Sequence, residues 1–183
     1  NAAKIYFIMC IAGAYLLQLG FSTFYSAGVE SFSEIKNISL SVAIILMLGF
    51  GVKAGMVPLH RWLPIAHPEA PSSISAPLSG ILTKAGIFGL ILIIYVLGFN
   101  AKVFSYLLVG IGLVTSFYGE IKTLYEKDIK RLFAYSTIGQ IGEIITILGV
   151  MSSLALSGVL YHVINHAVVK DLLFLSAGIL ILS

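Results

Sequence analysis

The chain has 183 residues, of which 58% are hydrophobic and only 10% are charged, and its formal net charge is +3. A mean hydropathy of +1.02, together with long apolar runs, is typical of an integral membrane protein and excludes a soluble globular domain. The few lysine and arginine residues form no basic stripe, so nothing indicates nucleic-acid binding. The single cysteine, Cys10, excludes an internal disulfide and a cysteine-based metal site.

Six apolar segments are long enough to cross a bilayer core of about 30 Å as helices. No segment shows the period-two alternation that a half-buried strand would have. The expected fold is therefore an all-α, polytopic transmembrane helix bundle. The expected spans are Ile5–Ser26, Ile38–Val57, Ser72–Gly98, Ala101–Gly119, Leu132–Val150 and Leu154 to the end.

The second span is expected to end in a break. Glycine residues at 49, 51 and 55 weaken its last turns, and Pro58 removes a helical hydrogen bond. The segment Leu59–Pro71 is then expected to form the tail of a broken helix and a turn. The polar segment Gly28–Asn37 is expected to link the first two spans.

The lysine and arginine residues at the span ends predict the orientation. One side collects Lys4, Arg61, Lys122, Lys127, Lys130 and Arg131, and the other collects Lys36 and Lys102. This asymmetry places the link around Arg61 and the charged segment Glu120–Arg131 in the cytoplasm. The charged segment is expected to be a solvated loop.

Three further lysines fall inside the spans, where an ionisable residue is a candidate functional residue by default. Lys53 lies close to the predicted cytoplasmic end, so snorkelling and a functional role are both open for it. Lys84 and Lys170 lie near the middle of their spans. A lysine side chain reaches roughly 6 Å, whereas the interface is about 15 Å away. These two amines therefore need a partner, water, or the loss of a proton.

The last span carries His162, His166 and Lys170 at intervals of four residues, which places them along one helical face. Imidazole groups and desolvated amines both titrate near neutral pH, so this row is expected to pass protons along a hydrated path. The opposite face, with Val168 and Leu172, is expected to meet protein or lipid. Hydrogen-bonded interior histidines and a zinc site are the alternatives, and the nearby amine makes a poor metal neighbour.

Glu143 lies within the fifth span, beside Gln140. A carboxylate there needs a cationic partner, a proton or water. The sequence leaves open whether Glu143 is a counter-ion for Lys84 or Lys170 or faces water.

Three stretches resemble the signatures of one family. They are VKAGMVPLHRWLPIAHPEAPSSISAPLSGILTKAGIFGL, KDIKRLFAYSTIGQIG and HVINHAVVKDLLFLSAG, and they span about Gly49 to Gly178. The family is that of the antiporter-like membrane subunits shared by respiratory complex I, membrane-bound group 4 hydrogenases and formate hydrogenlyases, and multi-subunit cation/proton antiporters.

The resemblance implies about fourteen helices in two inverted five-helix repeats, each with one broken helix. This chain would be a piece of such a protein, with residues 1–98 ending the first repeat and residues 101–183 starting the second. The resemblance and the residue patterns together give the proton-transfer candidates Lys53, Lys84, His162, His166 and Lys170. The accessory candidates are Glu143, Lys130, His60 and Asp171.

The expected function is that of a proton-translocating membrane subunit in a multi-subunit, redox-driven ion pump of the NADH–quinone oxidoreductase or membrane-bound hydrogenase type. The alternative is a sodium/proton antiporter module, for which the spans offer only Glu143 and Asp171 as carboxylates. A third reading is a membrane scaffold whose lysines pair with partner subunits. No cofactor or metal is expected in this chain; iron–sulfur clusters, flavin or a nickel–iron site would belong to partner subunits. The expected location is the cell membrane or an energy-transducing inner membrane.

Overall fold

The computed structural model describes residues 2–26, 38–97 and 101–182, and every regular element in these ranges is a helix. The predicted link Gly28–Asn37 lies outside the described residues. The elements are α1 (Ala2–Ser26), α2 (Leu40–Ala54), α3 (Leu63–Glu69), α4 (Ser72–Pro77), the π-helical turn η2 (Leu78–Leu82), α5 (Thr83–Leu97), α6 (Lys102–Tyr125), α7 (Ile129–Gly149) and α8 (Ser153–Leu182).

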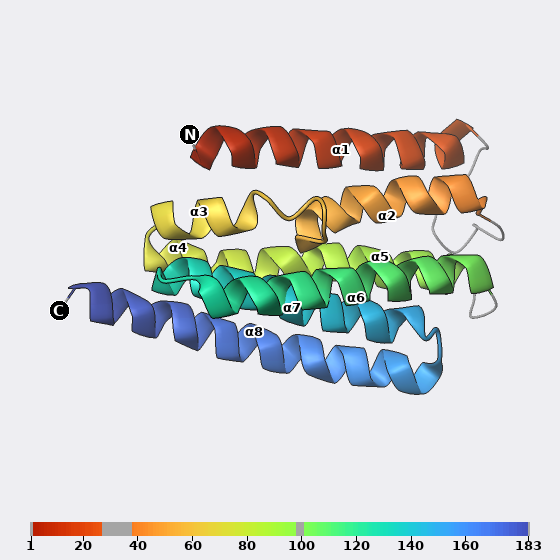
Figure 1. Cartoon of the computed structure of the whole chain (residues 1–183). Coiled ribbons are helices and arrows are strands. Elements are labelled where there is room, and N and C mark those ends of the chain that lie inside the picture. The colour runs from red at the N-terminus through yellow and green to blue at the C-terminus, as the bar shows by residue number, and fades with distance from the viewer. Residues whose placement is uncertain (1, 27–37, 98–100, 183) are drawn as a thin grey trace.

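The helices form six roughly parallel traverses that alternate in direction along the chain (Figure 1). Five of them, α1, α4–η2–α5, α6, α7 and α8, are each long and apolar enough to cross a membrane. The remaining traverse consists of the short apolar helix α2 followed by α3 (Figure 1). The all-α bundle with one broken helix near Pro58 is thus confirmed.

Small residues let α1 and α2 pack closely in opposite directions. Gly20 of α1 packs against the side chain of Leu46, and Gly13 packs against Val52. Since glycine has no side chain, these contacts bring the two helix backbones close together. Because Gly13 lies near the middle of α1, this pairing places Val52, near the end of α2, level with the middle of α1.

The second traverse continues beyond the break, contrary to expectation. The Trp62 ring lies 5.4 Å from the ring of Tyr6, near the start of α1, in an edge-on contact. α3 therefore continues beside the first turns of α1 and completes the traverse. The expected tail of the broken helix thus contains α3, which adds two further turns, and the predicted end of the second span at Val57 is too early. The cytoplasmic placement of the link around Arg61 stays a prediction.

The break between α2 and α3 is closed by specific hydrogen bonds. Gly55 ends α2 in the left-handed conformation, with φ of 82°, which glycine adopts without a steric penalty. The indole Nε1 of Trp62 donates to the carbonyl of Val52 at 2.7 Å, and the backbone N–H of Val57 donates to Thr115 Oγ1 on α6 at 3.2 Å. Irregular backbone at membrane depth is tolerated only when its polar groups are satisfied in this way.

The charged segment after the fourth span is mostly helical. α6 extends to Tyr125, and only residues 126–128 separate it from α7. Asp128 caps α7, because its carboxylate accepts a hydrogen bond from the backbone N–H of Arg131 at 2.8 Å. The expectation of a loop over Glu120–Arg131 is therefore wrong, because only residues 126–128 are not helical. The last turn of α6 is exposed, since 82% of Leu124 and 80% of Tyr125 are accessible.

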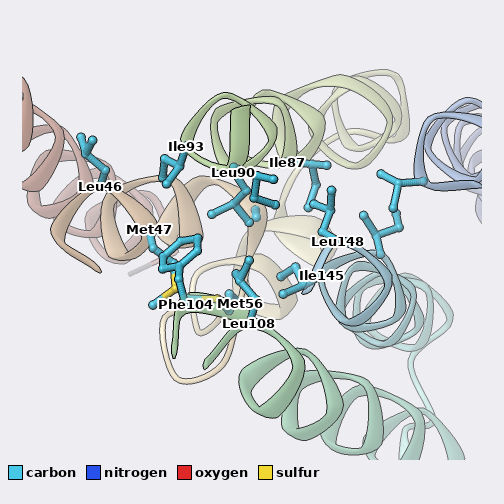
Figure 2. Close-up of a cluster of buried hydrophobic side chains, with 14 of the residues drawn as sticks. Leu46, Met47, Met56, Ile87, Leu90, Ile93, Phe104, Leu108, Ile145 and Leu148 are labelled. Atoms are coloured by element: carbon cyan, nitrogen blue, oxygen red, sulfur yellow. The ribbon is translucent and has the colours of Figure 1, made fainter. Parts of the chain in front are cut away.

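The apolar core lies where α2, α5, α6 and α7 meet. Buried side chains from these helices and from the break converge there (Figure 2): Leu46, Met47, Met56, Ile87, Leu90, Ile93, Phe104, Leu108, Ile145 and Leu148. α6 and α7 approach closely where Gly119 faces the backbone of Gly139 and where Gly142 faces the backbone of Ser116. This core fixes the positions of α5 and α7, the two helices that face α8 across the polar site.

Candidate functional site

Lys84 is a half-buried amine just after the π-helical turn. It is the thirteenth of the 26 residues from Ser72 to Leu97, so it lies in the middle of its traverse. Its Nζ donates to the carbonyl oxygen of Ser79 at 2.6 Å and lies 2.6 Å from Nδ1 of His166 on α8. The turn thus anchors the amine while α8 supplies its second partner.

The short contact between Lys84 and His166 restricts their protonation. Two nitrogen atoms 2.6 Å apart share one hydrogen, so either the ammonium donates to a neutral imidazole or an imidazolium donates to a neutral amine. Both groups cannot carry a proton on the facing nitrogen atoms. A proton that moves along this contact passes directly from one group to the other.

His162 extends this contact along α8. Its ring is stacked on that of His166, with the centroids 6.5 Å apart and the planes at 18°. Its Nε2 lies 3.0 Å from Oε1 of Gln140 and 3.9 Å from Oε2 of Glu143, both on α7. Gln140 in turn donates to Glu143 at 3.3 Å. These four residues and Lys84 form a polar row: Lys84, His166, His162, Gln140 and Glu143.

Lys170 lies one turn beyond the row and is buried, with 4% of its surface exposed. Its Nζ donates to Ser136 Oγ at 2.8 Å and lies 3.4 Å from the carbonyl oxygen of Phe133, both on α7. The same carbonyl accepts the hydroxyl of Thr137, which lies 2.9 Å from the hydroxyl of Ser79. Since the Ser79 carbonyl binds the lysine of the polar row, Ser79 and Thr137 form a hydroxyl bridge between the two amines.

The face of α8 that carries His162, His166 and Lys170 is turned toward α5 and α7. On the opposite face, Val168 and Leu172 are 56% and 60% exposed. The predicted division of this helix into a polar inner face and an apolar outer face is therefore confirmed. A hydrated path along the inner face stays a prediction.

Lys53 is not part of the polar row. It follows Val52, which packs on Gly13, the twelfth of the 25 residues of α1. It is half-buried and makes no hydrogen bond or ion pair with any residue in the described ranges. The expectation that Lys53 lies only a few residues from the end of its span is wrong, because α3 lengthens the traverse and leaves this lysine near its middle.

Two accessory candidates, Lys130 and His60, lie near the two ends of α3. Lys130 donates to the carbonyl oxygen of Ala70 at 2.9 Å, so its charge meets the C-terminal end of α3. His60 lies in the break, is 7% exposed and packs edge-on against Tyr118 at 4.5 Å. These contacts hold the break and the α3–α4 turn on α6 and α7.

The two acidic candidates occupy different places. The carboxylate of Asp171 lies directly against Gly80 of η2, where a side chain would collide with it. Glu143 is next to His162, and 41% of its side chain is exposed. Within the described ranges neither carboxylate lies within 4.0 Å of Lys84 or Lys170, so Glu143 is a direct counter-ion for neither amine.

Several polar residues of the site were not singled out from the sequence. Ser136 and Gln140 are four residues apart, and Glu143 follows three residues later, which is the spacing of one helical face in an otherwise apolar helix. That spacing was the available signal. His67 of α3, fully buried, is stacked on Phe174 with the ring centroids 4.5 Å apart. Nothing in its local sequence predicts this contact.

The geometry does not favour the zinc alternative. In the part of the chain that the structure describes, no group of three or more His, Cys, Asp or Glu side chains is arranged to hold a metal ion. The Nδ1 atom of His166 is engaged by Lys84 and its ring faces His162 in a stack, so the two imidazoles do not converge on one point.

A bundle of apolar helices with a broken helix, a π-helical turn and a buried row of amines and imidazoles defines a multi-pass membrane protein with ionisable groups inside its bundle. The family model described as "NADH:quinone oxidoreductase/Mrp antiporter, TM" matches residues 1–183. The chain belongs to this family of multi-pass membrane proteins.

Among its relatives, Hydrogenase-4 component B of Escherichia coli (strain K12) is 38% identical over 202 residues, covering 99% of this chain and 30% of the relative. "Putative antiporter subunit mnhA2" of Staphylococcus aureus (strain USA300 / TCH1516) is 35% identical over 199 residues, covering 95% and 25%. A solved structure of an archaeal membrane-bound sulfane sulfur reductase (MBS) matches with a TM-score of 0.87 and 29% identity, covering 97% of this chain and 39% of that one. The chain thus spans under a third of the length of these curated relatives.

Proposed function

We propose that this chain is part of a proton-translocating membrane subunit in a multi-subunit, redox-driven ion pump of the NADH–quinone oxidoreductase or membrane-bound hydrogenase type. The observation that carries the proposal is the 2.6 Å contact between Lys84 and His166 inside an apolar bundle, continued through His162 to Gln140 and Glu143. The family and the hydrogenase relative support it.

In this mechanism a proton moves along the polar row in steps. A protonated Lys84 donates through its hydrogen bond to the imidazole of His166, whose ring faces His162. The 6.5 Å separation of the two ring centroids leaves the second transfer to a water molecule or a ring rotation. His162 then passes the proton toward the Glu143 carboxylate. No bond other than those to the moving proton is made or broken.

Lys170 acts on this row through its charge. At an effective dielectric constant of about 20, two unit charges 7 Å apart interact by roughly 2 kcal/mol. A proton arriving on one lysine therefore favours release from its neighbour. The hydroxyl bridge of Ser79 and Thr137 links the sites of the two amines, because Lys84 binds the Ser79 carbonyl and Lys170 lies against the Phe133 carbonyl, which also accepts the Thr137 hydroxyl.

Lys53 is proposed as a separate proton-transfer residue at the broken helix. Its position near the middle of the second traverse supports this role. An amine at that depth is energetically costly, and ionisable residues inside membrane spans are therefore candidate functional residues. Residues 1–98 would end the first inverted repeat and residues 101–183 would start the second. The redox cofactors would belong to partner subunits of the complex.

The alternative function is that of a sodium/proton antiporter module, which the antiporter relative supports. It would use the same amines but requires an oxygen-lined cation site. Glu143 and Asp171 contact different helices, α8 and η2 respectively, and do not share a site. This separation favours the proton pump. Proton flux that depends on sodium concentration would favour the antiporter instead.

The test compares His166→Leu with Val168→Leu in the complete complex reconstituted into vesicles. Replacement of His166 should abolish proton uptake while electron transfer continues, because the row loses its central group. Replacement of the exposed Val168, on the other face of the same helix, should leave the proton-to-electron ratio unchanged. Wild-type pumping by the His166 variant would refute the relay, and loss of assembly in both variants would indicate a scaffold.

A further inference from the structure

Glu143 is an acidic side chain on the outer surface of a membrane-spanning helix. It is the fifteenth of the 21 residues of α7, and it follows Gly142, which packs on the backbone of Ser116 in the middle part of α6. At a rise of about 1.5 Å per residue, it lies roughly 9 Å inside the end of the helix. The carboxylate therefore lies within the apolar layer.

The partners of Glu143 leave its charge incompletely balanced. One carboxylate oxygen accepts from the amide of Gln140 at 3.3 Å, and the other is 3.9 Å from His162 Nε2, which already lies 3.0 Å from the Gln140 oxygen. The side chain remains 41% exposed. A charged group that faces hydrocarbon is costly, so this exposed part requires a polar or cationic neighbour.

A hollow lies beside this carboxylate. It has a volume of about 320 Å³ and lies between α6 and α7. It is lined by Leu113, Ser116, Glu143, Thr146 and Ile147. The apolar rim and the single carboxylate form a seat for a side chain with an alkyl stem and a positively charged end, which is the shape of lysine and arginine.

We propose that the surface around this hollow receives a transmembrane helix from the remainder of the same polypeptide, and that this helix presents a lysine or arginine to Glu143. Charge complementarity selects the cation. The curated relatives are more than three times as long as the part aligned with this chain, so their sequences extend well beyond the helices described here. Glu143 also ends the proposed proton relay, but the contact and the relay are tested separately, because crosslinking and thermal stability do not measure proton flux.

The first experiment maps the contact with Glu143 intact. A photo-crosslinking benzophenone amino acid replaces Leu113, at the rim of the hollow, in the full-length protein within its complex in native membranes. Val114 is the control, since it is 59% exposed on the same helix at the same depth but does not line the hollow. Mass spectrometry of the crosslinked peptides identifies the occupant. The expected product joins position 113 to a membrane-spanning segment with a lysine or arginine, several-fold more abundantly than from position 114.

The second experiment tests the charge. Glu143→Lys should lower the thermal stability of the assembled complex more than Glu143→Gln, and changing the identified lysine or arginine to glutamate should restore it. Crosslinks to lipid alone, to another subunit, or to a segment without a basic residue would overturn the proposal. So would a charge-reversed pair that is no more stable than the single variant.

Discussion

The molecule contains two interruptions of regular helix, and they create different environments for the lysines beside them. The break after α2 is closed by backbone and indole hydrogen bonds, and the adjacent Lys53 has no partner in the described ranges. In the π-helical turn η2 the Ser79 carbonyl accepts hydrogen bonds from side chains. Lys84 donates to this carbonyl and also contacts His166.

The difference comes from the opposing helices. α2 faces α1, whose contact residues are glycine and apolar side chains, so nothing polar reaches Lys53 from that side. η2 and α5 face α7 and α8, which bring hydroxyl groups and an imidazole to Lys84 and its turn. A helix interruption thus frees backbone polar groups, but a polar site forms only where the neighbouring helices also contribute polar side chains.

The largest expected effect is on proton transfer. Lys84→Ala should lower the proton flux of the reconstituted complex by about 100-fold, the typical contribution of a positioned proton-transfer group. Lys84→Arg should also impair pumping, because a guanidinium does not release its proton.

Lys53→Ala should likewise lower the proton flux of the reconstituted complex, while assembly stays intact. Normal flux in these variants would remove the corresponding lysine from the path.

The packing between the two interruptions is the next target. Gly86 of α5 lies against the backbone of Ala54, where an added Cβ would collide with the backbone nitrogen, whereas Gly110 has no atom within 4 Å of such a position. Gly86→Ala should therefore destabilise the protein by about 3 kcal/mol or prevent assembly. Gly110→Ala should be neutral or stabilise α6 by up to about 1 kcal/mol. Thermal unfolding in detergent would measure both; equal stabilities would contradict the close approach.

A matched pair of lysine variants sharpens the comparison itself. Lys84→Met leaves Nδ1 of His166 without its partner and removes one of the two side-chain donors to the Ser79 carbonyl, so it should cost about 1–3 kcal/mol of stability. Lys53→Met removes a charge that pairs with no described residue and should cost little or raise the stability. The difference in unfolding temperature between the two variants measures the contribution of the neighbouring helices. Equal losses would show that both lysines are equally anchored.

The smallest expected effect concerns the closure of the break. Thr115→Val removes the hydroxyl that accepts the Val57 N–H and should cost about 1 kcal/mol. Thr146→Val is the control, because the Thr146 hydroxyl donates only to Gly142 in its own helix. Faster hydrogen exchange at Val57 in the Thr115 variant alone would locate the effect. Unchanged exchange there would mean that Thr115 does not hold the break.

Much of the fold could be predicted because its signals are local. Apolar length gave the spans, and Gly55 with Pro58 gave the break, since backbone conformation and hydrogen-bond loss depend on single residues. The continuation of the second traverse through α3 could not be read in the same way. It depends on Trp62 bonding back to Val52 and packing on Tyr6, which lie ten and 56 positions away in the sequence.

The sequence by itself determined that this is a helical membrane protein with titratable groups inside its spans. It also placed His162, His166 and Lys170 on one helical face. Both conclusions were possible because hydropathy and helical periodicity are properties of short segments. Only the tertiary structure decided which of these groups meet. Lys84 and His166 are 82 residues apart, and their contact exists because the core fixes α5 opposite α8. Lys53 carries the same charge in a similar local sequence but pairs with no residue in the described ranges, a difference that no segment of either helix encodes alone.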